Sequence, residues 1–429
     1  MKKALLALMA LLSVGLVACA APANLGNDLG GIRLVQSDRQ RDTSPAVDQS
    51  DLSTLVDGNN VFAFDLFQAL RSDPGNLFFS PYSISAALAM TYAGARGDTE
   101  KEMAAALQFR LAQARLHQAF NELDLLLQQR GQGAKGKDDQ PFRLHVVNAI
   151  WGQAGFPFLP AYLDTLALSY GAGMRTVDFI KRTEAARLAI NQWVSEQTEQ
   201  RIKELVPSGA LNELTRLVLT NAIYFNAAWE RQFDKKATAD APFFRLDGSQ
   251  VTVPTMNQTE WFSYVKGAGY QAIELPYDGH ELSMVVLLPD SGQYAAFEKA
   301  LDAPVVKGII DSLANTHVEL SMPRFEYDSS FGLKPALTSL GMGGAFQDGA
   351  DFSGIDGRKD LVIQDVLHKA FVSVDETGTE AAAATAVIVG LTSMPLETVT
   401  LKLDRPFIYL IRDIATGQVL FVGRVLDPS

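Results

Sequence analysis

The segment from Asp375 to Leu396 constrains the fold of this chain most, because its composition suits two backbone states. Its sequence is DETGTEAAAATAVIVGLTSMPL, and it carries no charge after Glu380. The alanines Ala381 to Ala384 favour a helix, whereas the β-branched residues that follow them favour a strand. In a strand, every second side chain from Thr379 to Val389 would share one face, and that face is small or apolar throughout. The segment can therefore enter a packed sheet, and an exposed alanine loop or a short surface helix is the alternative.

The rest of the chain predicts a large packed core for such a segment to join. It has 429 residues, of which 47% are hydrophobic and 20% charged, as in globular proteins. The formal net charge of −12 argues against a nucleic-acid-binding surface. Neither a linker nor an internal repeat interrupts the sequence from Leu55 onwards, so residues 55–429 are expected to form one domain.

The N-terminus, MKKALLALMALLSVGLVACA, predicts export from the cell. Two lysines precede an apolar run and a site of small residues, which is the pattern of a signal peptide over residues 1–18. The run is too short for an ordinary membrane span. Its last residues, Leu16-Val17-Ala18-Cys19, resemble the lipobox of bacterial lipoproteins, in which the cysteine is lipidated. Cys19 is the only cysteine of the chain.

Lipidation at Cys19 would anchor the protein to a bacterial membrane without a spanning helix. Ala20 resembles the residue that follows the cysteine in outer-membrane lipoproteins, which favours the outer membrane or the cell surface. The alternative is an ordinary signal peptide and a secreted protein. Residues 19–54 are polar with little apolar periodicity, and they predict a flexible tether before a domain that starts near Leu55.

The order of the predicted elements indicates an α+β fold. Helical patterns dominate the first half of the chain, and strand patterns follow one another after Leu214. The Gly-rich segment from Arg130 to Gln140 has glycines at dinucleotide-fingerprint spacing, but no strand precedes it, so we expect a loop. Lys135 and Lys137 in this loop are the only local candidates for contact with a polyanion, and basic residues are too sparse to predict such a cofactor.

Motifs for catalysis and metal binding are missing from the sequence. The five histidines have no metal-ligand spacing, and no cysteine partners exist for them. There is no P-loop, and the Phe352-Ser353-Gly354 sequence lacks the first glycine of a nucleophile elbow. We therefore expect no metal, no cofactor and no enzymatic activity, but a binding protein or an inhibitor.

An ordered series of motifs resembles the serpin family over nearly all of residues 55–428. The motifs are NLFFSPYSIS (76–85), LTNAIYFNAAWERQF (219–233), ELPY (274–277), SMVVLLP (283–289), MPRFEYDSSFGLKPALTSLGM (322–342), HKAFVSVDETGTEAAAAT (368–385), and DRPFIYLIRD and GQVLFVGRVLDP near the C-terminus. The resemblance implies a single α+β domain with three β-sheets, eight or nine helices and an exposed reactive-centre loop. It also implies a monomeric protease inhibitor that is not itself an enzyme.

The opening segment resembles the hinge of inhibitory serpins, in which a protease cuts the loop, forms an acyl-enzyme, and is trapped when the loop inserts into the main sheet. Non-inhibitory members often carry a large, charged or proline residue there. Here the only such residue between Thr379 and Thr385 is Glu380, which the alternation points outward and which matches the family. A non-inhibitory binding protein is the alternative. The implied hinge residues are Glu376, Gly378, Thr379, Glu380, Ala381, Ala382, Ala383, Ala384 and Thr385.

The family's spacing from Glu376 places the reactive bond at Thr392-Ser393. A threonine before the cut suits an elastase-like serine protease with a small pocket. Leu391 and Met394 are alternative positions, suited to chymotrypsin-like enzymes or to papain-like cysteine proteases such as cathepsins. No Arg or Lys lies between Glu380 and Lys402, which disfavours trypsin-like targets because their pocket pairs with a cation.

Two further groups of residues are implied by position in the family. The shutter, a hydrogen-bonded cluster beneath the strands that part, matches Ser80, Ser83, Asn221 and His368. The breach, where the loop enters, matches Trp229 and Arg324. Each of the four shutter residues alone could instead be a helix cap or a satisfied core polar group. Arg324 is a candidate partner for Glu376, and such a pair would contribute about 0 to 1 kcal/mol if it were exposed.

Overall fold

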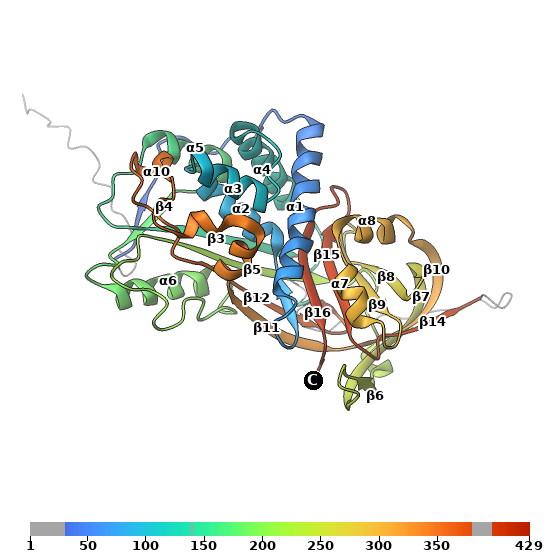
Figure 1. Ribbon diagram of the computed structural model, residues 1–429. Coiled ribbons are helices and arrows are strands. Elements are labelled where there is room, and N and C mark those ends of the chain that lie inside the picture. The colour runs from blue at the N-terminus through green and yellow to red at the C-terminus, as the bar shows by residue number, and fades with distance from the viewer. Residues whose placement is uncertain (1–30, 139, 380–396) are drawn as a thin grey trace, which may run out of the picture.

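The computed structural model describes residues 31–138, 140–379 and 397–429 (Figure 1). Several residues singled out in the sequence lie outside these ranges, and their predicted roles stay predictions. They are Cys19, the hinge residues Glu380, Ala381, Ala382, Ala383, Ala384 and Thr385, and the reactive positions Leu391, Thr392, Ser393 and Met394.

Helices dominate the first part of the described chain. They are α1 (Gln49–Leu70), α2 (Pro81–Tyr92), α3 (Gly97–Ala106), α4 (Gln113–Gln128), α5 (Pro160–Tyr170) and α6 (Thr183–Gln197). The helix α2 begins where the sequence favours a start, because the Ser80 side chain accepts from the Ser83 amide and Pro81 needs no partner for its nitrogen. All twelve residues of α2 are buried, and it packs against strands of both sheets.

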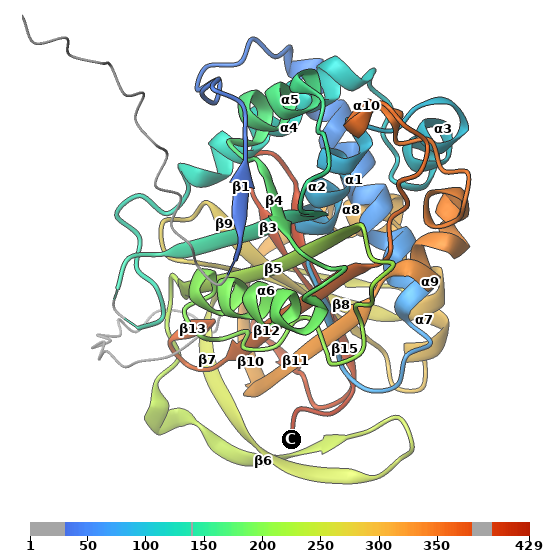
Figure 2. The same ribbon diagram turned by 90° about the vertical axis from the view of Figure 1, so that its left-hand side faces the viewer.

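One sheet has seven strands, and its order across the sheet is β1-β4-β3-β5-β13-β12-β11. The strands are β1 (Arg33–Val35), β4 (Met174–Val177), β3 (Arg143–Gln153), β5 (Leu217–Ala228), β13 (Gly378–Thr379), β12 (Val366–Val374) and β11 (Phe325–Gly332). Figure 2 shows α6 lying across the front of this sheet, and a second hydrophobic cluster fills the space between them. Every residue of the central strand β5 is buried as a result.

The other sheet has nine strands, with β14-β10-β7-β8-β9-β15-β16-β2 in order and β6 paired to β7. The strands are β14 (Val399–Lys402), β10 (Ala314–Pro323), β7 (Gln250–Gly267), β8 (Tyr270–Pro276), β9 (Leu282–Pro289), β15 (Phe407–Asp413), β16 (Val419–Val425), β2 (Leu77–Phe79) and β6 (Ala239–Phe244). Where three sheets were expected, hydrogen bonding gives two in the described ranges. The reason is that β7 pairs with β6 along its first part and with β8 at its end, which joins two sheets into one.

The α+β class expected from the sequence is confirmed. The later part of the chain adds α7 (Tyr294–Ala300), α8 (Ala303–Asp311), α9 (Lys334–Leu337) and α10 (Ser353–Asp356), with short turns η1 (Lys235–Ala237), η2 (Thr338–Met342) and η3 (Gly343–Phe346). The ten α-helices of the described residues exceed the eight or nine expected, and two of them, α9 and α10, are only four residues long. Within the same ranges, no helix has the length and apolar character that a bilayer crossing needs.

Ordered structure begins earlier than the expected tether over residues 19–54 allows. The strand β1 pairs with β4 at the edge of the seven-stranded sheet, and α1 starts at Gln49 rather than near Leu55. Between them, Arg41 donates from Nε to Asn121 Oδ1 (2.7 Å) and from Nη2 to Asp124 Oδ2 (2.6 Å). Polar side chains attach this segment to α4, so its lack of apolar periodicity does not make it flexible.

Candidate functional site between β5 and β12

Two neighbouring strands of the seven-stranded sheet, β5 and β12, pair along only part of their length. They form a parallel ladder from Leu219–Val366 to Ile223–Ala370, which we call the paired end. Beyond it the strands separate, and β13, described at Gly378 and Thr379, lies between them. We call this part, residues 224–228 and 371–374, the open end. The chain that follows β12 thus folds back into a gap of its own sheet.

A tight hairpin brings β13 into the open end. The N–H of Asp375 donates to the Gly378 carbonyl (3.0 Å), and the Gly378 N–H donates to the Asp375 carbonyl (3.3 Å). Gly378 has φ of +155°, and a Cβ atom there would lie 2.1 Å from the Ala227 carbonyl oxygen. Only glycine fits this position, so the predicted hinge glycine is what lets the chain enter the sheet.

Trp229 and Tyr277 hold the hairpin from the side. Trp229 donates from its indole Nε1 to the Asp375 carbonyl and from its backbone N–H to the Thr377 carbonyl, both at 2.9 Å. Its ring stacks on Tyr277 with centroids 4.7 Å apart. The Tyr277 hydroxyl lies 2.9 Å from the Thr379 hydroxyl, and burial raises the pKa of Tyr277 well above its usual range, so this hydroxyl stays protonated. Trp229 therefore lies beside the hairpin that leads into β13, and its role as a breach residue stays a prediction.

Arg324 and Glu376 form the ion pair that the sequence suggested, but the pair is not an exposed one. Arg324 donates from Nε to Glu376 Oε1 (2.8 Å), and its Nη2 and the Thr238 hydroxyl contact the same oxygen. The Glu376 side chain is 1% exposed, whereas that of Arg324 is 42% exposed. A buried carboxylate without a partner is strongly unfavourable, so the value for an exposed pair does not apply.

The four residues assigned to the shutter lie together beneath the paired end. His368 faces Asn221 across the ladder, and its Nδ1 contacts Asn221 Oδ1. The Asn221 Nδ2 group donates to Ser83 Oγ, and the Ser80 N–H donates to His368 Nε2 (3.2 Å). Burial lowers the pKa of His368 to about 3, so the imidazole is neutral. Because Nε2 accepts, its single proton lies on Nδ1 and is donated to Asn221.

Asn148 of β3 is a fifth member of this cluster that sequence reasoning missed. Its side chain accepts from Ser83 Oγ (3.0 Å) and from Asn221 Nδ2, and it donates to the Ser83 carbonyl (3.1 Å). The available signal was a polar residue within an otherwise apolar strand pattern, Val146 to Trp151.

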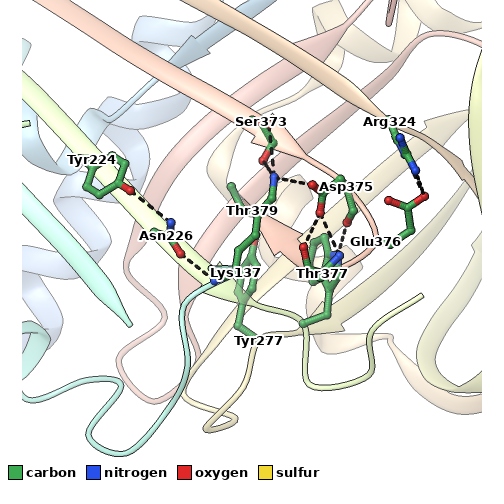
Figure 3. Close-up of polar contacts among 11 residues, drawn as sticks. Lys137, Tyr224, Asn226, Tyr277, Arg324, Ser373, Asp375, Glu376, Thr377 and Thr379 are labelled. Carbon is green, nitrogen blue, oxygen red and sulfur yellow. Dashed lines mark hydrogen bonds and ion pairs between the residues drawn. The ribbon is translucent and has the colours of Figure 1, made fainter. Parts of the chain in front are cut away.

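Lys137 lies in a different environment from the one that the sequence suggested. It was considered as a surface cation, but it is 1% exposed and lies at the open end, while Lys135 beside it is exposed. Figure 3 shows its side chain reaching from the loop beside β5 towards Ser373 of β12 and Asp375 of the hairpin. Lys137 is therefore not available to a polyanion.

The described residues that flank 380–396 lie in different sheets. Thr379 pairs in the seven-stranded sheet, and β14 pairs in parallel with β10 at the edge of the nine-stranded sheet. Across residues 31–138, 140–379 and 397–429, no cluster of three or more His, Cys, Asp or Glu side chains is placed to hold a metal ion.

Comparison with known proteins agrees with this arrangement. The family model described as Serpin (serine protease inhibitor) matches residues 57–428. An uncharacterized serpin-like protein of Thermococcus kodakarensis is 40% identical over 377 residues, covering 87% of this chain and 86% of that protein. The leukocyte elastase inhibitor of Sus scrofa is 40% identical over 392 residues, covering 88% of this chain and all of that protein. The solved structure of tengpin, a thermophilic serpin in its native state, superposes with a TM-score of 0.79 at 27% identity, covering 92% of this chain and 100% of tengpin.

Proposed function

The chain belongs to the serpin family, and we propose that it is an irreversible inhibitor of serine proteases, not an enzyme. It would trap its target by inserting the cleaved loop between β5 and β12. The observation that carries this proposal is β13, because Gly378 and Thr379 already pair with β5 and start a strand in the gap.

The trapping step follows from the direction of β13. The serine oxygen of the protease attacks the carbonyl carbon of Thr392, the bond to the Ser393 nitrogen breaks, and an ester joins the protease to Thr392. The freed chain then extends β13, with the small side chains of Ala381 and Ala383 facing the core. Each inserted residue adds backbone hydrogen bonds to two strands, and the protease is carried along before water can hydrolyse the ester.

The proposed targets are elastase-like serine proteases. Thr392 before the cut suits a small specificity pocket, and one relative bears the name leukocyte elastase inhibitor. Use of Leu391 or Met394 instead would favour a chymotrypsin-like enzyme or a papain-like cysteine protease.

We further propose that the protein is exported through a signal peptide of residues 1–18 and anchored to a bacterial membrane by a lipid on Cys19. Because β1 starts at Arg33, only the residues between Cys19 and β1 are left to act as a tether. Replacing Cys19 with Ser should move the protein from the membrane fraction to the soluble fraction. Unchanged partitioning would rule out the anchor.

Mixing the protein with an elastase tests the inhibitory function. We expect a complex that survives SDS and contains one copy of each protein, and mass spectrometry should place the cut after Thr392. The same elastase with its active-site serine chemically blocked is the control, and it should give no complex. Cleaved protein together with fully active elastase would mean that the chain is a substrate and a non-inhibitory member of its family.

A further inference from the structure

Lys137 connects the two strands that border the gap. Its backbone N–H donates to Asn226 Oδ1 of β5 (2.7 Å). Its Nζ lies 3.1 Å from the Ser373 carbonyl oxygen of β12, 3.3 Å from Ser373 Oγ and 3.1 Å from Asp375 Oδ2 (Figure 3). A single residue of the loop before β3 thus holds both sides of the open end.

The register of β13 shows where Lys137 lies relative to an inserting loop. Thr379 is paired with Ala227 of β5 and with Val374 of β12, antiparallel in both cases. In an antiparallel ladder the partner moves back by one residue as the strand moves forward by one. The next loop residue, Glu380, would therefore meet Asn226 and Ser373, which are the two residues that Lys137 bonds.

The hydrogen-bond pattern identifies the acceptor that Lys137 and an inserted residue 380 would share. Asp375 and Gly378 exchange both of their backbone hydrogen bonds. Bonded and non-bonded pairs alternate along an antiparallel ladder, so the bonded pair after Asp375–Gly378 joins Ser373 to residue 380. The Ser373 carbonyl that now accepts from Lys137 Nζ is thus the acceptor that the backbone N–H of an inserted residue 380 needs.

The loop that carries Lys137 is built to approach β5 closely. A Cβ atom at Gly136 would lie 2.5 Å from Asn226 Oδ1, so a larger residue would keep the loop away. Lys135 is fixed by its backbone, which accepts from the Ala228 N–H (3.0 Å) and donates to Asp278 Oδ2 (2.8 Å). The buried ammonium group is paired with Asp375, whose side chain is 22% exposed. A lysine on a flexible stem can return to water when it is displaced, so this contact is reversible.

We propose that Lys137 is a positioning residue that slows insertion of the loop, because its ammonium group bonds the Ser373 carbonyl oxygen that the backbone N–H of an inserted residue 380 needs. Insertion of the loop has to displace this ammonium group from Ser373 and Asp375. The role rests on the proposed function, since it regulates the insertion on which inhibition depends.

Uptake of a synthetic peptide with the sequence of residues 380–390 tests this role without any protease. The full uncleaved protein is incubated with the peptide, and incorporation is followed by native gel electrophoresis. Replacing Lys137 with Met removes the charged donor but keeps the stem, and we expect uptake roughly tenfold faster, the factor that one charge-assisted hydrogen bond supplies. The control Lys135→Met alters the exposed lysine of the same loop and should match the wild type, and Lys137→Arg should restore slow uptake.

The stability of the cleaved protein separates this role from a purely structural one. With the loop inserted, Lys137 is displaced, so cleaved Lys137→Met and cleaved wild type should unfold at the same temperature. If Lys137 had a purely structural role, the variant would unfold at a lower temperature than the wild type both before and after cleavage. If Lys137→Met does not fold, Lys137→Gln, whose side chain is too short for the same contacts, should also take up the peptide faster.

Equal uptake by wild type and the Lys137 variants would overturn the role of Lys137 and leave the proposed inhibition intact. If none of the proteins takes up the peptide and none gives an SDS-stable complex with elastase, the proposed function fails, and the role of Lys137 fails with it.

Discussion

The paired end and the open end of the same two strands are held together by different kinds of interaction. At the paired end, β5 and β12 form a direct ladder, and a neutral, buried network from His368 to Ser83 lies beneath it. At the open end there is no direct ladder. Two ion pairs, Lys137–Asp375 and Arg324–Glu376, flank the described residues of β13, Gly378 and Thr379.

This difference indicates the direction in which the sheet opens. Uncharged hydrogen bonds that are fully buried have no solvent to replace them when they break, so the paired end resists separation. Lys137 and Arg324 have long side chains whose charged groups can return to water. Separation should therefore start at the open end and move towards the paired end, which is the direction in which β13 would grow.

Acidification should give the largest effect, and about half of it should come from His368 at the paired end. Burial lowers the pKa of His368 to about 3 and that of His117, which lies in α4, to about 4. In the unfolded chain both imidazoles take up a proton near pH 6.5, so the free energy of unfolding is highest above that pH and falls as the pH drops towards 4. At pH 4.5 the loss should be about 5 kcal/mol for the two histidines together.

Urea unfolding at pH 7.5 and pH 4.5 checks this prediction. The His368→Asn variant should lose about half of the pH dependence that the wild type shows between these values. Equal stability of the wild type at the two pH values would contradict a neutral, buried His368.

Replacing Asn221 with Ala should give the next largest loss of stability. It removes the partner of the His368 N–H and of Ser83 and Asn148, all buried beneath the paired end. The free energy of unfolding should fall by about 3 kcal/mol, because several polar groups are left unpaired. Gln132→Ala in the exposed part of the loop before β3 is the control and should change little. A loss below about 1 kcal/mol would show that the network does not hold the paired end together.

Replacing Arg324 with Ala should destabilise the open end by roughly 2 kcal/mol, since it leaves the buried Glu376 carboxylate with the Thr238 hydroxyl alone. This value lies below the full penalty for breaking a buried pair because Arg324 is partly exposed. A double-mutant cycle with Glu376→Gln measures the coupling. Zero coupling energy would mean that the pair adds nothing to the open end.

Replacing Gly378 with Ala should have the smallest effect on stability, roughly 1 kcal/mol, but it should change inhibition. The added Cβ collides with the Ala227 carbonyl and drives β13 out of the gap. Insertion then starts later, so elastase should yield more cleaved protein and less complex than with the wild type. Gly349→Ala, in a positive-φ turn with open space around it, is the matched control. An unchanged ratio of complex to cleaved protein would show that β13 has no part in starting insertion.

Sequence reasoning reached the fold class and most of the site, and it failed where burial depends on distant partners. Ser80, Ser83, Asn221 and His368 could be named because ordered motifs carry them. Lys137 could not, since its burial depends on Ser373 and Asp375, more than 200 positions away, and a Gly-rich loop with two lysines has the local pattern of a surface. The segment around Arg41 was misjudged for the same reason, because its order comes from Asn121 and Asp124 rather than from its own hydrophobic pattern.

Thermal unfolding of the protein before and after a single cut in the loop tests insertion between β5 and β12 most directly. If the cleaved loop extends β13 and completes the sheet, the cut protein should unfold at a clearly higher temperature than the intact one. An equal or lower unfolding temperature after cleavage would contradict insertion, and with it the proposed mechanism of inhibition.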